Sequence, residues 1–159
     1  MTVQVDLFCE DAAHEAIARA IAERLAKEEA IEISIRVGSA RAGVGRLMQE
    51  LRAFAEATRR QSGAPDVLVV LIDSNSDGPT VRRNQIATAN LDRVFPLHVV
   101  GTPDPCVEAW LLADGGTLAR LYSPAPSSAP TADCDELKRR LKASLVGAGE
   151  IVVQGGARS

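Results

Sequence analysis

Apolar residues in the first hundred positions recur with two periods, one typical of strands and the other of helices. Residues 67–72 are apolar at six consecutive positions, the pattern of a strand buried on both faces of a parallel sheet. Alternating apolar residues predict further strands at about 3–8 and 31–37, and residues 95–100 predict a fourth. Because Pro96 cannot donate to a sheet, the fourth strand should lie at an edge or begin just after the proline.

Apolar residues spaced three and four apart predict helices between these strands. The first helix follows Asp11, an expected N-cap, and its predicted buried face is made of Ala13, Ile17, Ile21 and Leu25. The second helix ends near Ser62, and its apolar face is made of Leu47, Leu51, Phe54 and Ala55. The third helix should begin at Pro79, with Asp77 as its cap.

Beyond residue 103 the sequence predicts two more helices and a low-complexity segment. A fourth helix should follow Asp104 and Pro105, and a last helix should cover about 133–146. Between them, residues 123–132 are rich in Pro, Ser and Ala, and we expect this loop to be mobile. Residues 151–153 predict a short final strand.

The alternation of strands and helices predicts an α/β fold. A chain of 159 residues suits a single domain over 1–159. We expect a Rossmann-like, mostly parallel sheet of four to five strands flanked by helices, with right-handed crossovers. Phe, Trp and Tyr total only five residues, so the core must be built from aliphatic side chains.

Composition excludes several classes of protein. A net charge of −3 is not that of a strongly basic nucleic-acid binder. Cys9, Cys106 and Cys134 are odd in number and widely spaced, which predicts neither a disulfide framework nor a zinc site. The sequence contains neither a signal-peptide pattern nor an apolar stretch of about 20 residues, so we expect a cytoplasmic protein without a membrane segment.

Oxygen-bearing side chains follow the predicted strands at the positions where open α/β sheets hold their sites. They are Glu10, Asp73, Asn75, Asp77 and Glu108. If the first and third strands are neighbours, Glu10 and Asp73 meet at one rim of the sheet. Carboxylates that converge there would suit Mg²⁺ or Mn²⁺, and such an ion would make phosphoryl chemistry the natural reaction class.

Three stretches of the chain resemble the TOPRIM fold. They are Phe8-Cys-Glu-Asp11, Ile72-Asp-Ser-Asn-Ser-Asp-Gly78, and Glu108-Ala-Trp-Leu-Leu-Ala-Asp114. The similarity covers about residues 1–114, and is greatest to stand-alone bacterial TOPRIM-like proteins related to the nuclease domain of the OLD (overcoming lysogenisation defect) family. It implies an acid–base or metal role for Glu10, a Mg²⁺ ligand at Asp73, and a metal or positioning role for Glu108.

The chain departs from the family pattern at three positions. Asp11 replaces the usual glycine, and Asn75 replaces the second aspartate of the Asp-x-Asp motif, so metal affinity would fall unless Asp77 substitutes. His14 occupies a place where nuclease-type relatives often have a second acid, and we expect it to be an exposed residue of the first helical turn.

Basic side chains offer candidate contacts to a nucleic-acid backbone. They are Arg41, Arg46, Arg82, Arg83 and Lys138, the last in a weaker echo of the same resemblance. The alternative is that these residues form ordinary solvated helix faces.

Three functions remain open at this point. The first is a Mg²⁺- or Mn²⁺-dependent nuclease that acts on nucleic acid. The resemblance implies a separate ATPase or other protein partner, in a multi-protein system such as phage defence, and a homodimer stays open. The second is a catalytically silent TOPRIM-like module that binds a partner protein or nucleic acid. The third is a receiver-like domain phosphorylated on Asp73, with Glu10 and Asp11 as its acidic pair.

Overall fold

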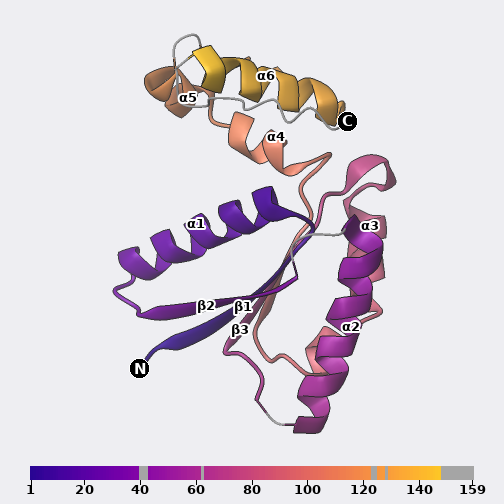
Figure 1. Cartoon of the computed structure of the whole chain (residues 1–159). Coiled ribbons are helices and arrows are strands. Elements are labelled where there is room, and N and C mark those ends of the chain that lie inside the picture. Colours follow the sequence, from indigo (N-terminus) through magenta and orange to yellow (C-terminus); the bar gives the residue numbers. More distant parts are fainter. Residues whose placement is uncertain (40–42, 62, 123–124, 128, 148–159) are drawn as a thin grey trace, which may run out of the picture. The chain divides into compact units, whose positions relative to one another are not determined.

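A computed structural model describes residues 1–39, 43–61, 63–122, 125–127 and 129–147 of the chain (Figure 1). The chain divides into two compact units, Met1–Pro103 and Asp104–Ser159. The single domain over 1–159 that we expected from chain length stays a prediction.

The first unit is built on a parallel sheet of four strands in the order β2-β1-β3-β4. The strands are β1 (Val3–Cys9), β2 (Ile33–Ser39), β3 (Val67–Leu71) and β4 (His98–Gly101). This confirms the predicted α/β fold with a parallel sheet. The fourth strand lies at an edge and begins after Pro96, as expected from a residue that cannot donate to the ladder. The predicted strand at 151–153 lies outside the described residues.

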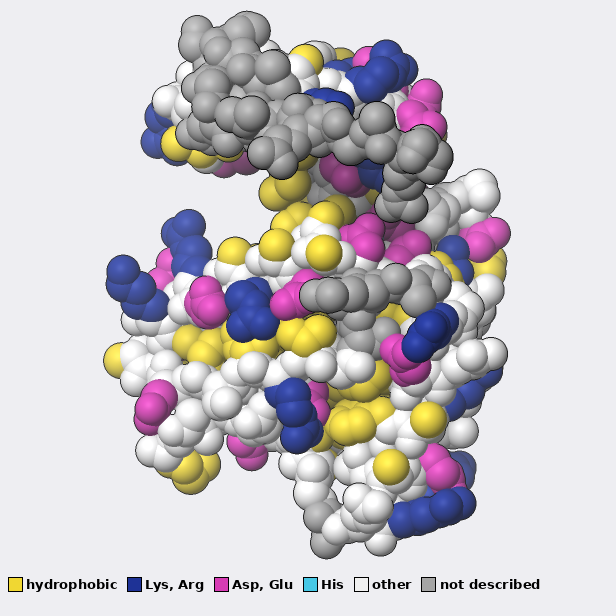
Figure 2. Space-filling model, in the orientation of Figure 1, with side chains coloured by type: hydrophobic (Ala, Val, Ile, Leu, Met, Phe, Trp, Pro, Cys, Tyr) yellow, Lys and Arg dark blue, Asp and Glu magenta, His cyan; other side chains and the backbone are white. Residues whose placement is uncertain are grey.

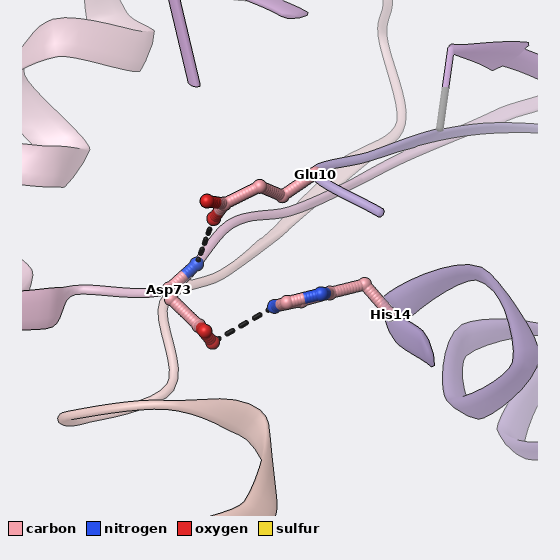
Figure 3. Close-up of side chains that lie close together, drawn as sticks. All are labelled: Glu10, His14 and Asp73. Carbon is pink, nitrogen blue, oxygen red and sulfur yellow. Dashed lines mark hydrogen bonds and ion pairs between the residues drawn. The ribbon is translucent and has the colours of Figure 1, made fainter. Parts of the chain in front are cut away.

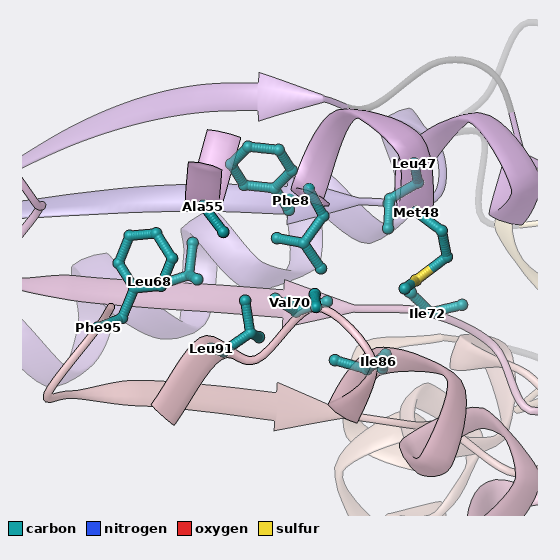
Figure 4. Close-up of a cluster of buried hydrophobic side chains, with 12 residues drawn as sticks. Phe8, Leu47, Met48, Ala55, Leu68, Val70, Ile72, Ile86, Leu91 and Phe95 are labelled. Carbon is teal, nitrogen blue, oxygen red and sulfur yellow. The ribbon is translucent and has the colours of Figure 1, made fainter. Parts of the chain in front are cut away.

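The main core lies between one face of the sheet and the helices α2 (Gly43–Gln61) and α3 (Pro79–Ala87) (Figure 4). The short 3₁₀ turns η1 (Asn75–Asp77) and η2 (Leu91–Arg93) flank α3. The predicted apolar face of α2 is confirmed, because Leu47, Leu51 and Ala55 are buried. The sheet, helix and loop residues of this core are Phe8, Leu47, Met48, Leu51, Ala55, Leu68, Val70, Ile72, Ile86, Ala89, Leu91 and Phe95.

Helix α1 (Ala12–Glu28) lies on the opposite face of the sheet from α2 (Figure 1). Its expected N-cap is confirmed, since the Asp11 carboxylate accepts hydrogen bonds from two backbone N–H groups. Its predicted buried face is wrong: Ile21 and Leu25 are exposed, and the buried residues are His14, Ala18 and Ala26. The buried face of α1 therefore carries a histidine and two alanines in place of the larger aliphatic side chains.

Phe8 of β1 is buried beside Gly38 of the neighbouring strand. A β-carbon at Gly38 would overlap the Phe8 ring, so this position needs glycine for space. The β1–β2 register also shifts between Leu7 and Phe8. The strand predicted at about 31–37 begins at Ile33 and continues through Gly38 to Ser39.

The second unit contains helices α4 (Val107–Leu112), α5 (Gly115–Leu121) and α6 (Cys134–Gly147). The helix predicted at about 133–146 is therefore confirmed, and α5, capped by Asp114, is additional. Cys106, Leu112, Leu118 and Leu137 form its buried core. The loop expected to be mobile at 123–132 falls partly outside the described residues, and the structure does not test its mobility. In the described parts of the chain, no helix is long and apolar enough to cross a membrane.

Candidate metal centre

Glu10 and Asp73 meet at the carboxyl ends of two neighbouring strands. β1 and β3 pair in parallel with Cys9 opposite Leu71, and the Glu10 N–H continues the ladder by donating to the Leu71 carbonyl at 3.1 Å. The Glu10 Oε2 atom accepts a hydrogen bond of 3.1 Å from the Asp73 backbone N–H (Figure 3). The predicted meeting of these two acids at one rim of the sheet is confirmed.

His14 joins this pair from the first turn of α1. Its Nε2 atom lies 2.8 Å from Oδ1 of Asp73, and its Nδ1 atom lies 2.7 Å from Oδ1 of Asp11 (Figure 3 draws the first contact). The side chain is 2% exposed, so the expectation of an exposed histidine is wrong. The reason is tertiary: one helical turn after Glu10 brings the imidazole over the end of β3.

The electrostatics of this cluster follow from burial and from mutual hydrogen bonds. Burial raises the pKa of Glu10, although the hydrogen bond from the Asp73 backbone N–H opposes the rise. Burial alone would lower the pKa of His14, but the hydrogen bonds to Asp73 and Asp11 outweigh it and raise that pKa to about 9. In Asp11, the hydrogen bonds with His14 outweigh partial burial and lower the pKa of the carboxyl. At neutral pH, His14 is therefore an imidazolium between two carboxylates.

Neighbouring Cys9 takes no part in this polar network. Its thiol is buried, and burial raises its pKa to about 12. A thiol with so high a pKa is not a nucleophile at neutral pH.

Within the first unit, Glu10, His14 and Asp73 each offer one ligand atom, and these atoms all lie within 4.8 Å of one another. Two carboxylates and an imidazole are a donor set that divalent metals accept. The residues therefore fit a metal ion by donor type and spacing.

Among the described residues, Asp77 does not join this group of ligand atoms. Asn75 is exposed in the turn η1, with a positive φ of 49°. The Asp77 carboxylate accepts a hydrogen bond of 2.9 Å from Nη2 of Arg82. The expected helix cap at Asp77 is wrong, because Gly78 is the residue at the N-cap of α3. Asp77 therefore forms an ion pair with Arg82.

Arg82 is buried, in contrast to the phosphate contact that we expected for it. Its Nε donates to the backbone oxygen of Asp73 at 3.0 Å, and Nη1 donates to Gln85 at 2.7 Å. Together with the bond from Nη2 to Asp77, all three guanidinium nitrogens donate inside the protein. The side chain is 6% exposed. Arg82 therefore holds the segment that carries Asp73, and its buried guanidinium does not face solvent to meet a phosphate.

The other predicted basic contacts lie on the surface or outside the described residues. Arg83 is exposed, and its Nε donates to the Thr102 hydroxyl at 3.2 Å. Arg46 is exposed and pairs with Glu50 on the same helix at 2.9 Å. Arg41 lies outside the described residues. Figure 2 shows Lys and Arg side chains interspersed with Asp and Glu on the visible face, without a continuous basic surface.

Two predicted site residues belong to the second unit. Glu108 lies in the first turn of α4, and its Oε2 atom is buried without a hydrogen-bond partner among the described residues. Lys138 is exposed on α6. Their roles rest on the sequence resemblance alone.

His14 is the functional candidate that sequence reasoning placed in the wrong environment. The available signal was its spacing: a residue four positions after Glu10, at the start of a helix that follows a central strand, lies over the rim of the sheet. The fold matches the coarse expectation of a small α/β unit with a parallel sheet, and assignment to TOPRIM rests on the motifs. Comparisons of the chain with protein-family models, with curated proteins and with solved structures each find no match.

Proposed function

We propose that the chain is a divalent-metal-dependent phosphodiesterase of the TOPRIM type that cleaves nucleic acid. The observation that carries the proposal is the meeting of Glu10 and Asp73, 63 positions apart in the chain, at the ends of adjacent parallel strands. This edge of an open α/β sheet is where such folds bind ligands. Glu10 and Asp73 would hold the ion, and Mg²⁺ or Mn²⁺ would polarise the phosphodiester and favour ionisation of water.

Glu10 is the candidate general base. Its Oε2 atom is held by the Asp73 backbone N–H, and burial raises its pKa toward the range in which a carboxylate accepts a proton efficiently. In the proposed hydrolysis, the water oxygen would form the new bond to phosphorus and one ester P–O bond would break. Glu10 would take the proton that water releases, and the leaving oxygen would take a proton from solvent water. Asp73 orients the reacting groups, and its backbone is fixed in turn by Arg82.

Arg83 is the best-placed residue of the first unit for holding the substrate backbone. It lies one position after Arg82 on α3, is exposed, and is oriented by Thr102, which directly follows β4. A guanidinium suits phosphate oxygens by charge and geometry. Arg41, Arg46 and Lys138 are further candidates, and Glu108 enters the proposal as a second acid through the resemblance. The same resemblance suggests a separate ATPase as partner.

The test is cleavage of labelled single- and double-stranded DNA and RNA by the purified chain with Mg²⁺ or Mn²⁺. Asp73→Asn and Glu10→Gln should each lower the cleavage rate by at least a hundredfold. Glu23→Gln, which changes an exposed acid on α1, is the matched control and should leave the rate unchanged. Cleavage that survives Asp73→Asn would rule out this site, and absence of cleavage with every substrate would favour the alternative below.

The alternative is a catalytically silent module that binds a partner protein or nucleic acid. It is favoured by Asp77, which pairs with Arg82 and lies outside the group of ligand atoms, and by Asn75, whose amide adds no charge. Such a module would bind its partner equally well with and without metal. Phosphorylation of Asp73, as in a receiver domain, has less support, because that carboxylate is buried and bonded to His14.

A further inference from the structure

The imidazole of His14 is fixed at both of its nitrogens. Nδ1 lies against Asp11, and Asp11 is itself immobilised because the same oxygen accepts from the backbone N–H groups of Ala13 and His14 at 2.9 and 3.0 Å. Nε2 is thereby directed at Asp73. A histidine whose far nitrogen is bound by a carboxylate is the arrangement that orients metal-ligating histidines in proteins.

Acidic side chains outnumber the imidazole in this cluster. Glu10 bonds to the Asp73 backbone N–H, and Asp11 lies at the other nitrogen of His14 with a side chain that is 58% exposed. Ligand atoms of Glu10, His14 and Asp73 lie within 4.8 Å of one another, and a dication bound there would replace the proton between Nε2 of His14 and Asp73.

The donor types bear on the kind of ion. Nε2 of His14 and Oδ1 of Asp73 are 2.8 Å apart, the length of their hydrogen bond, so both atoms point into the same small space. Imidazole is a ligand of first-row transition metals, whereas Mg²⁺ prefers oxygen donors and retained water.

We propose that His14 is a metal ligand, that Asp11 is its positioning residue, and that the site binds a first-row transition-metal dication such as Mn²⁺ in preference to Mg²⁺. This inference rests on the proposed function for the ligands Glu10 and Asp73. The inference adds the imidazole nitrogen of His14 to the oxygen ligands from Glu10 and Asp73, and it favours Mn²⁺ over Mg²⁺.

The test is metal binding to the full chain, followed without any substrate. Titration calorimetry should give a dissociation constant for Mn²⁺ at least tenfold lower than that for Mg²⁺. Pulsed electron paramagnetic resonance of the Mn²⁺-loaded protein should detect coupling to an imidazole ¹⁴N nucleus. The chain has two histidines, so His98→Gln should retain this coupling and His14→Gln should abolish it.

Two further variants separate ligand identity from structure. His14→Asp, which restores an oxygen donor, should reverse the preference toward Mg²⁺. Asp11→Asn keeps a good N-cap but removes the charge that faces Nδ1, and should weaken Mn²⁺ binding about tenfold. Circular dichroism would establish that each variant is folded. Equal affinity for the two ions, or Mn²⁺ bound without nitrogen coupling, would overturn the inference.

The outcomes for this inference and for the nuclease proposal are distinguishable. Mn²⁺ bound through His14 in a chain that cleaves no nucleic acid would support the inference and contradict the nuclease. Cleavage that depends on Asp73 but shows no nitrogen coupling would do the opposite.

Discussion

His14 and Asp73 are 59 positions apart in the chain, and their side chains lie 2.8 Å apart at the end of the central strands. The contact joins the first turn of α1 to the residue that follows Ile72, and both side chains are buried. The contact therefore ties the packing of α1 to the charge of the candidate site. We make four predictions, on this contact, on the arginines of α3, and on two further contacts of the first unit.

The His14 contact should make stability depend on pH. The folded protein holds the imidazole proton more tightly than the unfolded chain does, because the folded pKa is about 9 and the unfolded value is about 6.5. The stabilisation is therefore fully present below pH 6.5 and is lost as pH rises through about 9. It should amount to about 3 kcal/mol at most.

The measurement is urea unfolding of the metal-free protein and of His14→Gln between pH 6 and pH 10. The difference in unfolding free energy should shrink steadily as pH rises. A difference that stays constant across this range, or an NMR titration that gives His14 a pKa near 6.5, would contradict the prediction.

Arg82 and Arg83 are adjacent, but changing each to Met should affect different properties: stability for Arg82 and nucleic-acid binding for Arg83. Arg82→Met removes the hydrogen bonds that Arg82 donates to Asp77 and to the Asp73 carbonyl, and should cost about 2 kcal/mol or more of unfolding free energy. Arg83→Met should change stability by less than about 0.5 kcal/mol, but should weaken binding of a labelled oligonucleotide and reduce its salt dependence by about one counterion. A large loss of stability in Arg83→Met, or weaker oligonucleotide binding by a stable Arg82→Met, would contradict these roles.

Gly38→Ala should destabilise the first unit by about 1–3 kcal/mol, because the added methyl group meets the Phe8 ring inside the core. Phe8→Leu should also destabilise, but the double variant should be more stable than the sum of the two costs predicts. Thermal and urea unfolding of all four proteins give this coupling. If the losses of unfolding free energy in the two single variants simply add in the double variant, the methyl group at position 38 does not meet the Phe8 ring.

Arg36 should contribute far more stability than a typical surface arginine. Its Nε donates to Oδ1 of Asp6 at 3.0 Å and its Nη2 pairs with Oδ2, and the Asp6 side chain is 2% exposed. Arg36→Ala leaves that buried carboxylate with Gln4 as its remaining described side-chain donor, and should cost about 2–3 kcal/mol. Arg24→Ala removes an exposed pair with Glu28, which solvent screens, and should leave the unfolding free energy nearly unchanged. Similar costs for both would contradict the prediction.

The fold was predictable because its signals are local. The six apolar residues at 67–72 predicted β3, which covers Val67–Leu71, and the apolar spacing of Leu47, Leu51 and Ala55 predicted the buried face of α2. The same reasoning failed for α1, where Ile21 and Leu25 suggested the wrong buried face. Apolar spacing favours the face with the largest aliphatic side chains, but the buried face of α1 carries His14, Ala18 and Ala26.

The site was predictable in part for a related reason. Glu10 and Asp73 follow strand ends, and parallel neighbours place such residues at one rim. The roles of Asp77 and Arg82 could not be predicted, because their pairing depends on how η1 turns into α3. A carboxylate that looks like a ligand in the sequence can equally be the partner of a nearby buried cation.

The sequence by itself determined the strands, most of the helices, and the presence of acids where the strands end, since each depends on residues within a few positions of one another. Only the tertiary structure decided that β1 lies beside β3, that His14 is buried between Asp11 and Asp73, and that Arg82 is enclosed. Those outcomes depend on contacts between segments far apart in the chain, which no local pattern of residues encodes.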